Sequence, residues 1–373
     1  MRHVAAFLLI FCLAPLTAFA ANMSTVAKQA IIIDAQTGQV LFEKNPNEKM
    51  PTSSMSKTMT MYMVFEALKE GRVKLDDEFE VSERAWRMGG SKMFVELGKK
   101  IKLEDLIQGV IVQSGNDATV VIAEGLAGSE GEFALQATRK AHEMGMKDSN
   151  FVNASGWPDP DHYSTAHDLA ILGLRTIEDF PEYYKYYAEK EFTYHNIKQQ
   201  NRNPLLYKNI GADGVKTGHT ESGGFGLIGS GVMGGRRVVM VLNGMKDMAE
   251  RSQESARLLE WALRAFENVK LFSEGETVET APVVMGQVEE VPLTIEKDMI
   301  YTLPMGSKNE IQARAVFEGP LVAPVAKGQR VGKLEIIIPG MDPAEVPLIA
   351  AADVPHLGFF KGALEKAKLH LGL

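Results

Sequence analysis

The sequence pattern changes at about residue 269, and the two sides of this change favour different folds. Before it, apolar runs of strand length alternate with stretches whose apolar residues recur at helical spacing. After it, short β-branched runs are separated by Pro and Gly, which is typical of a small all-β module. The length of 373 residues also exceeds what one hydrophobic core usually spans. We therefore predict an α+β domain over residues 22–268 and a β-rich domain over residues 269–352.

The N-terminus has the pattern of a secretory leader. A short positive start is followed by an apolar run from Val4 to Leu16 and by the small-x-small cleavage signal Ala18-Phe19-Ala20. We expect residues 1–20 to be a signal peptide; a retained anchor is the alternative, although the run is short for a membrane span. The only cysteine, Cys12, lies inside it. The exported chain would therefore use neither disulfides nor thiol chemistry.

The last residues, 353–373, have the pattern of an amphipathic helix. Apolar residues recur at helical spacing and lysines occupy other positions: Leu357, Phe360, Leu364, Ala367 and Leu371, with Lys361, Lys366 and Lys368. Such a helix can lie in a membrane interface. A helix packed on its own domain has the same pattern, and spacing alone does not separate the two.

The charge of the chain argues against a nucleic-acid partner. The 40 Lys and Arg residues face 48 Asp and Glu residues, a formal net charge of −8, and neither sign runs in long blocks. Phosphate binding needs a concentrated basic surface. We expect no nucleic acid to bind.

A first motif, Ser54-Met55-Ser56-Lys57, lies at the start of a helix predicted over residues 55–68. One helical turn separates Ser54 from Lys57, so both side chains project from the same face. A neutral lysine amine can take the proton of a serine hydroxyl, and burial or a second cation can lower its pKa enough. The motif is weak alone, because a capping serine with an exposed lysine has the same spacing.

A second motif, Ser114-Gly115-Asn116, falls between helices predicted over residues 103–112 and 118–127. Its hydroxyl and amide could relay a proton and hold a substrate amide. An ordinary turn at the end of a helix has the same residues.

A third motif, Lys216-Thr217-Gly218, is followed by His219 and by a run of glycines. We predict it at the start of an edge strand, where Gly218 would let a substrate backbone approach and pair. A hairpin with a solvated lysine is the alternative.

The three motifs together are far more specific than each alone. Their order, S-x-x-K, S-x-N and K-T-G, resembles that of the penicillin-recognising serine enzymes. Ser-Gly-Asn in the middle, and His219 after the third motif, are similar to the low-molecular-mass penicillin-binding proteins that are serine D-alanyl-D-alanine carboxypeptidases. The resemblance covers nearly the whole mature chain and includes these segments: Ile33-Asp34-Ala35, Pro51 to Thr60, Ser164-Thr165-Ala166, Asn201-Arg202-Asn203 and Ala323-Pro324.

The resemblance implies a β-lactamase-like fold, with an antiparallel sheet flanked by helices, and an attack on the last peptide bond of a peptidoglycan stem peptide. Carried over, Ser54 is the nucleophile and Lys57 its base. Ser114 and Lys216 pass the proton to the leaving D-alanine. The resemblance implies no cofactor or metal.

The resemblance also implies how the substrate is held. Asn116 and Thr217 would bind the peptide, and the backbone N–H groups of Ser54 and His219 would form the oxyanion hole. β-Lactam antibiotics would acylate the same serine and act as inhibitors. The family ends in an amphipathic membrane-surface helix, so the resemblance implies attachment of this chain to the periplasmic face of the inner membrane.

Arg202 is a candidate clamp for the substrate's terminal carboxylate, because a guanidinium binds a carboxylate through two parallel hydrogen bonds. Arg251 is a candidate assistant. Each could equally be a surface arginine paired with a local acid.

Several other functions stay open at this point. A class A β-lactamase would need a deacylating Glu-x-x-x-Asn, which is absent between Ser114 and Lys216, although other β-lactamases do without it. A D,D-endopeptidase, a penicillin-sensing protein or a cell-wall-binding protein without turnover would carry the same motifs. A metal peptidase is disfavoured because the histidines are scattered and no H-E-x-x-H is present.

Overall fold

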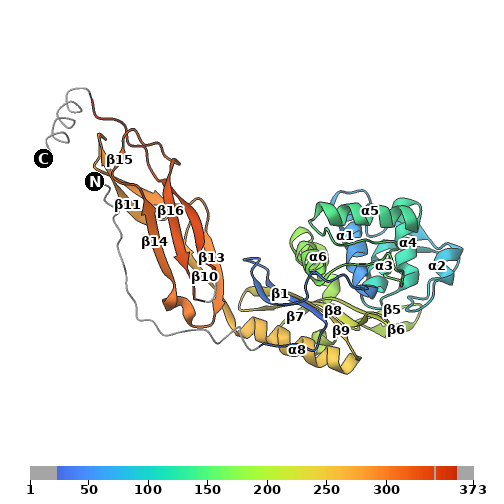
Figure 1. Ribbon diagram of the computed structural model, residues 1–373. Coiled ribbons are helices and arrows are strands. Elements are labelled where there is room, and N and C mark those ends of the chain that lie inside the picture. Colours follow the sequence, from blue (N-terminus) through green and yellow to red (C-terminus); the bar gives the residue numbers. More distant parts are fainter. Residues whose placement is uncertain (1–22, 340–341, 359–373) are drawn as a thin grey trace. The chain divides into compact units, whose positions relative to one another are not determined.

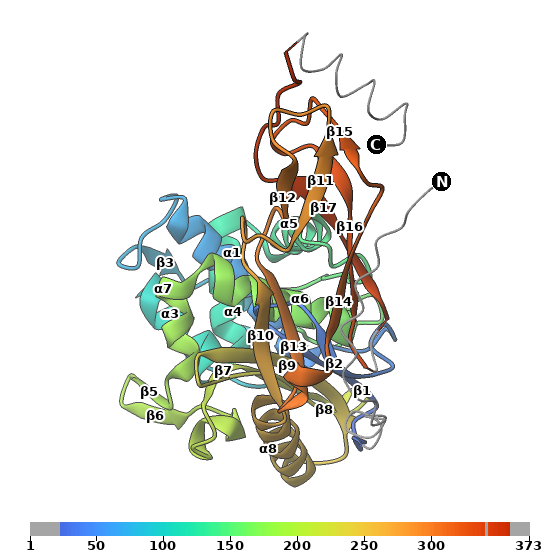
Figure 2. The ribbon, with the colours of Figure 1, turned by 90° about the vertical axis from the view of Figure 1, so that its left-hand side faces the viewer.

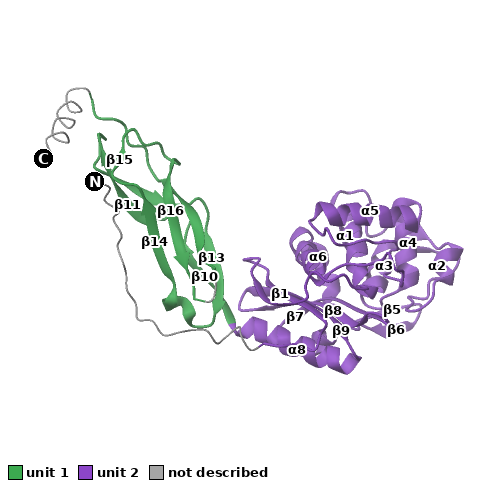
Figure 3. Cartoon of the chain, in the orientation of Figure 1, with its two compact units in different colours: residues 1–22, 266–373 green, residues 23–265 purple. Residues whose placement is uncertain are grey.

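The computed structural model describes residues 23–339 and 342–358 (Figure 1). The chain divides into two compact units between Ala265 and Phe266 (Figure 3), close to the predicted change of pattern at residue 269. The predicted signal peptide, residues 1–20, lies outside the described residues. So does the predicted tail helix beyond Gly358.

A five-stranded antiparallel sheet runs through the first unit in the order β2-β1-β9-β8-β7. Its strands are β1 (Gln29–Asp34), β2 (Val40–Lys44), β7 (Ala212–Thr220), β8 (Gly224–Met233) and β9 (Arg236–Met245). The apolar run Ala30-Ile31-Ile32-Ile33 is buried on both faces, because β1 lies between two strands and under helices. The strand β7 forms one edge, so it can pair with an extended peptide.

Helices cover both faces of this sheet (Figures 1 and 2). On one face lies α8, and on the other a larger layer packs around α1 and α6. The helices are α1 (Lys57–Lys69), α2 (Glu83–Arg87), α3 (Leu103–Ile111), α4 (Asn116–Ala127), α5 (Glu130–Glu143), α6 (Ala166–Asp179), α7 (Pro181–Tyr184) and α8 (Met248–Arg264). Apolar side chains such as Ile31, Phe65 and Val121 join sheet and helices in one core. The predicted fold class, an antiparallel sheet flanked by helices, is confirmed.

Short elements complete this unit and place the motifs. They are the 3-10 helices η1 (Ser53–Ser56), η2 (Lys185–Ala188) and η3 (Pro204–Tyr207), and the strands β3 (Glu78–Glu80), β4 (Lys100–Lys102), β5 (Glu191–Tyr194) and β6 (Ile197–Gln200). Three details differ from prediction. The first motif begins in η1 rather than in an α-helix, Asn116 starts α4 rather than lying in the turn before it, and Lys216 lies in the middle of β7 rather than at its start.

Over residues 266–339 and 342–358, the second unit consists of strands and one 3-10 turn, η4 (Ser307–Glu310), as the sequence predicts. A six-stranded sheet has the order β14-β16-β17-β12-β11-β15, and β10 pairs with β13 (Figure 2). The strands are β10 (Phe266–Phe272), β11 (Glu279–Val284), β12 (Glu290–Thr294), β13 (Met299–Pro304), β14 (Gln312–Phe317), β15 (Leu321–Val322), β16 (Arg330–Ile337) and β17 (Ala344–Ala350). Inward side chains such as Val291, Leu293 and Leu348 form a core of its own.

The start of the predicted tail helix belongs to this β unit. Val354 bridges to Val325, and His356 bridges to Gly286, so residues 353–358 are not helical. Over residues 23–339 and 342–358, no helix has the length and apolar character that crossing a membrane requires.

Candidate active site

The turn that carries Ser54 is held closely by two other segments. Gly156 has a φ of +76°, and a Cβ on it would lie 1.7 Å from the carbonyl oxygen of Ser53. Gly218, in β7, approaches from another side, where a Cβ would lie 2.9 Å from the carbonyl oxygen of Thr52. Any larger residue would push the turn away, which explains the glycine of the Lys-Thr-Gly motif.

Lys57 lies beside Ser54 with its amine fully enclosed. Its Nζ is 2.9 Å from Ser54 Oγ, 2.7 Å from Asn116 Oδ1 and 2.6 Å from the Ser155 carbonyl oxygen. Amide and carbonyl oxygens can only accept hydrogen bonds. A neutral Lys57 therefore donates its two N–H groups to Asn116 and Ser155 and turns its lone pair toward the Ser54 hydroxyl.

Burial, and then the Arg202 cation, lower the pKa of Lys57 to about 7, against the opposing effect of Asp117. A substantial fraction of the amine is therefore neutral near pH 7. This is the protonation state that a base for Ser54 needs.

The second and third motifs also meet. Lys216 Nζ lies 3.0 Å from Ser114 Oγ and 3.2 Å from the Thr217 carbonyl oxygen. Ser114 has a φ of +60°, in the left-handed region that ends the preceding helix and turns the chain into α4. Burial, and then the cations Lys57, Arg202 and Arg251, hold the pKa of Lys216 well below its usual range.

The predicted substrate-binding residues have different surroundings. Thr217 and Gly218 are buried in the edge strand, and His219 is exposed and stacks on Phe225 with ring centroids 3.9 Å apart. Asn116 was expected to hold the peptide, but its side chain is engaged within the protein. Besides binding Lys57, it donates from Nδ2 to the Gly89 carbonyl oxygen at 2.9 Å.

Two arginines add positive charge to the same site. Arg202 is exposed and donates to Ser91 Oγ at 2.6 Å rather than to a local acid. Arg251 is buried, and its Nε has no hydrogen-bond partner among the described residues. Burial, and then Arg202, lower the pKa of Arg251 to about 10. Cations held this way favour an incoming carboxylate.

Sequence reasoning missed the groups that support these side chains. One of them is the Ser155 carbonyl, which was missed because any residue supplies a backbone oxygen and the sequence does not mark this one. Asp117 is another: its buried carboxylate accepts N–H groups of Met93, Phe94 and Val95 and so ties the loop between α2 and β4 to the start of α4. Its place directly after Ser-Gly-Asn was the one available signal.

A metal centre has no candidate ligands in the described part of the chain, where no group of three or more His, Cys, Asp or Glu side chains could hold an ion. Tyr184, Tyr186 and Tyr187 are buried in the core of the first unit, so they offer no exposed platform for a ligand.

The assembled site can be compared with known proteins. Residues 17–247 match the family described as D-alanyl-D-alanine carboxypeptidase, and residues 266–356 match the C-terminal domain of penicillin-binding protein 5. The chain belongs to the D-alanyl-D-alanine carboxypeptidase family. The carboxypeptidase DacC of Escherichia coli is 38% identical over 364 residues, which are 94% of this chain and 91% of that relative. The resemblance noted from the motifs is confirmed.

Solved structures agree with this membership. Penicillin-binding protein 5 of Haemophilus influenzae is similar with a TM-score of 0.79 and 37% identity, over 90% of this chain and 99% of that one. Penicillin-binding protein D2 of Listeria monocytogenes, solved with bound ampicillin, is similar with a TM-score of 0.59 and 27% identity, over 64% of this chain and 98% of that one.

Proposed function

We propose that the protein is a serine D,D-carboxypeptidase that removes the terminal D-alanine from peptidoglycan stem peptides. The observation that carries this proposal is the geometry of Lys57, whose other two partners are obligate acceptors and leave its lone pair for Ser54. Family membership supplies the substrate class.

Acylation begins when Lys57 takes the Ser54 proton. Ser54 Oγ then attacks the carbonyl carbon of the last peptide bond, and the backbone N–H groups of Ser54 and His219 stabilise the oxyanion. The C–N bond breaks as the proton taken by Lys57 passes through Ser114 and Lys216 to the leaving D-alanine nitrogen, which returns Lys57 to its neutral form. The product is an ester on Ser54, which water hydrolyses to regenerate the hydroxyl.

The cations of the site orient the substrate. Arg202 at the surface and the buried Arg251 attract the terminal carboxylate, and Thr217 donates its hydroxyl to the same group. Because Asn116 is engaged with Lys57 and Gly89, we assign it first to orienting the base. A contact to the substrate amide would be additional.

Mass spectrometry with benzylpenicillin, followed by an assay of D-alanine release from diacetyl-Lys-D-Ala-D-Ala, tests the function. We expect one drug adduct per chain on the peptide that carries Ser54, together with D-alanine release. An adduct without release would indicate a penicillin-sensing protein. Rapid penicillin hydrolysis would indicate a β-lactamase. If the protein forms no adduct and also releases no D-alanine, the proposal is contradicted.

The place of action is part of this proposal and rests on the sequence pattern of the two ends. We expect export with residues 1–20 as the signal peptide and attachment to the periplasmic face of the inner membrane through the amphipathic tail. Because Val354 and His356 belong to the β unit, the clean truncation is after Gly358. Removing residues 359–373 should release the protein from membranes, and persistent sedimentation with them would contradict the anchor.

A further inference from the structure

The carbonyl of Ser155 makes the shortest of the three contacts to Lys57 Nζ, at 2.6 Å. It comes from a segment without helix or strand, so no backbone ladder sets its direction. A free loop would let this oxygen turn away, and the amine would then lose one of the two acceptors that aim its lone pair at Ser54. Something must hold the loop.

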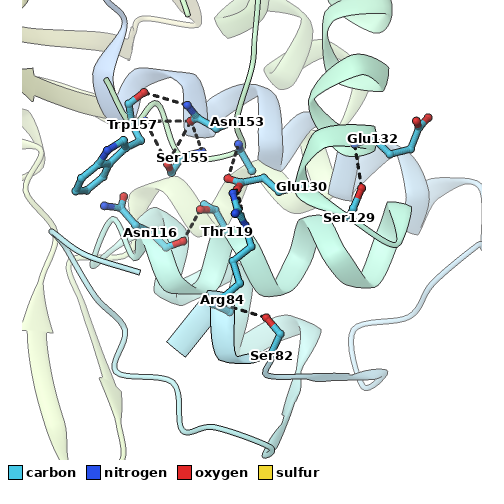
Figure 4. A network of polar contacts seen from close by, with 12 residues as sticks. Ser82, Arg84, Asn116, Thr119, Ser129, Glu130, Glu132, Asn153, Ser155 and Trp157 are labelled. Atoms are coloured by element: carbon cyan, nitrogen blue, oxygen red, sulfur yellow. Dashed lines mark hydrogen bonds and ion pairs between the residues drawn. The ribbon is translucent and has the colours of Figure 1, made fainter. Parts of the chain in front are cut away.

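Asn153 has the contacts to do so (Figure 4). Its Oδ1 accepts the N–H groups of Ser155, Gly156 and Trp157 at 3.2, 2.8 and 3.0 Å. Its Nδ2 donates to the Trp157 carbonyl oxygen at 3.0 Å. One side chain therefore ties three consecutive peptide groups around the Ser155 carbonyl.

Ala154, which lies between Asn153 and Ser155, is hydrogen-bonded to other parts of the first unit. Its N–H donates to Glu130 Oε1 at 3.2 Å, and the same carboxylate pairs with Arg84 (Figure 4). Its carbonyl oxygen accepts the Thr60 hydroxyl at 2.6 Å, and Thr60 lies on α1, one turn after Lys57. The loop is thus attached both to the helix of the base and to a buried carboxylate.

We propose that Asn153 is a positioning residue for the reaction: it holds the Ser155 carbonyl against Lys57 Nζ and so keeps the lone pair of the base on Ser54. This inference rests on the proposed role of Lys57 as the base. Asn153 touches neither reacting atoms nor the two amines, and it acts through the loop alone.

Two variants of Asn153 separate the effect of its hydrogen-bond acceptor from the effect of its side-chain volume. Asn153→Leu keeps the volume and removes the acceptor, so we expect the acylation rate constant at saturating benzylpenicillin to fall about 100-fold, as displacements of about 1 Å do. Asn153→Asp keeps an oxygen that accepts the three N–H groups, and we expect it to stay within about tenfold of the unmodified protein.

Asn150→Leu is the matched control. Its Nδ2 donates to the Asp161 carbonyl oxygen at 2.6 Å in the same stretch of chain, but it has no link to Ser155. Acylation should stay unchanged. A melting curve for each variant verifies folding, and Asn153→Ala replaces the leucine variant if leucine prevents folding.

Each outcome decides the inference. Slow acylation of Asn153→Leu with recovery in Asn153→Asp supports it. Acylation of folded Asn153→Leu at the unmodified rate overturns it, and so does equal slowing in the leucine and aspartate variants. If the unmodified protein itself forms no adduct, the proposed function fails instead, so the two failures are distinguishable.

Discussion

The site contains two serine–lysine pairs that look alike but are built differently. Ser54 and Lys57 are three residues apart, where η1 passes into α1, whereas Ser114 and Lys216 come from an inter-helix turn and an edge strand. Both amines are buried, and burial is the main cause that lowers the pKa of each. Their remaining surroundings differ.

Lys57 is surrounded by fixed acceptors, whereas Lys216 has a hydroxyl and the carbonyl of its own neighbour. The positive charges of Lys57, Arg202 and Arg251 also lower the pKa of Lys216. The first pair is therefore arranged to hold a proton reversibly near pH 7. The pKa of the second amine is also lowered, but this amine lies beside other cations, so it suits a relay whose surrounding charge is balanced when a carboxylate enters.

The largest expected difference is between the two serines. Ser54→Ala should abolish the penicillin adduct and lower D-alanine release by at least about 10⁴-fold, because the nucleophile is gone. Ser114→Ala should still form the adduct, about 10²- to 10³-fold more slowly, because it loses only a proton relay. Intact mass against time measures both. An adduct on Ser54→Ala would show that the nucleophile is misassigned.

The second lysine gives the next largest effect. Lys216→Met should slow acylation about 10²-fold through loss of the relay. The fold should be kept, because an apolar side chain of similar length replaces a buried amine with few fixed partners. Stopped-flow acylation and a thermal melt measure the two quantities. An unchanged rate would remove Lys216 from the mechanism and leave a single functional pair.

The two pairs also differ in how far the sequence predicts them. The proximity of Ser54 and Lys57 follows from helical spacing, because the contact is local. That of Ser114 and Lys216, 102 residues apart, came only from resemblance to a family, since no spacing rule joins a turn to a strand. The engagement of Asn116 with Lys57 was missed for the same reason: it depends on the packing of α4 against α1.

The fold shows the same division between local and distant contacts. The fold class and strands such as β14 and β16 follow from apolar and β-branched runs, which are local. The strands β10 and β13 were not predicted; they pair with each other across a segment that contains β11 and β12, and such a distant pairing leaves no pattern in the local sequence. In Met299–Pro304 the β-branched residues Ile300 and Thr302 do not form a continuous run, so the local strand signal is weak.

Gly156 packs closely against the turn that carries Ser54, so replacing it with alanine should affect acylation, although less than the changes above. Gly128→Ala is the control. Both have similar positive φ angles, +76° and +79°, but a Cβ on Gly128 meets nothing within 4 Å. Gly128→Ala should cost about 1 kcal/mol of stability and leave acylation intact. Gly156→Ala should be less stable still and should acylate more slowly, because its Cβ displaces the turn of Ser54. Equal acylation in the two variants would contradict this.

The smallest effect is a shift in pH dependence, and it tests the electrostatic link between the pairs. Because Lys57 must be neutral to act, acylation should rise with pH through a pKa of about 7. The Arg202 cation lowers this pKa, so Arg202→Met should raise it and move the rising limb to higher pH. Arg139→Met, on α5 beside Glu132, should leave the limb in place. The profile of the second-order acylation rate constant reports the pKa of the free enzyme. A limb that stays in place or moves to lower pH in Arg202→Met would mean that Arg202 does not lower the pKa of the base, and the proposed electrostatic link between the arginine and this pair would be wrong.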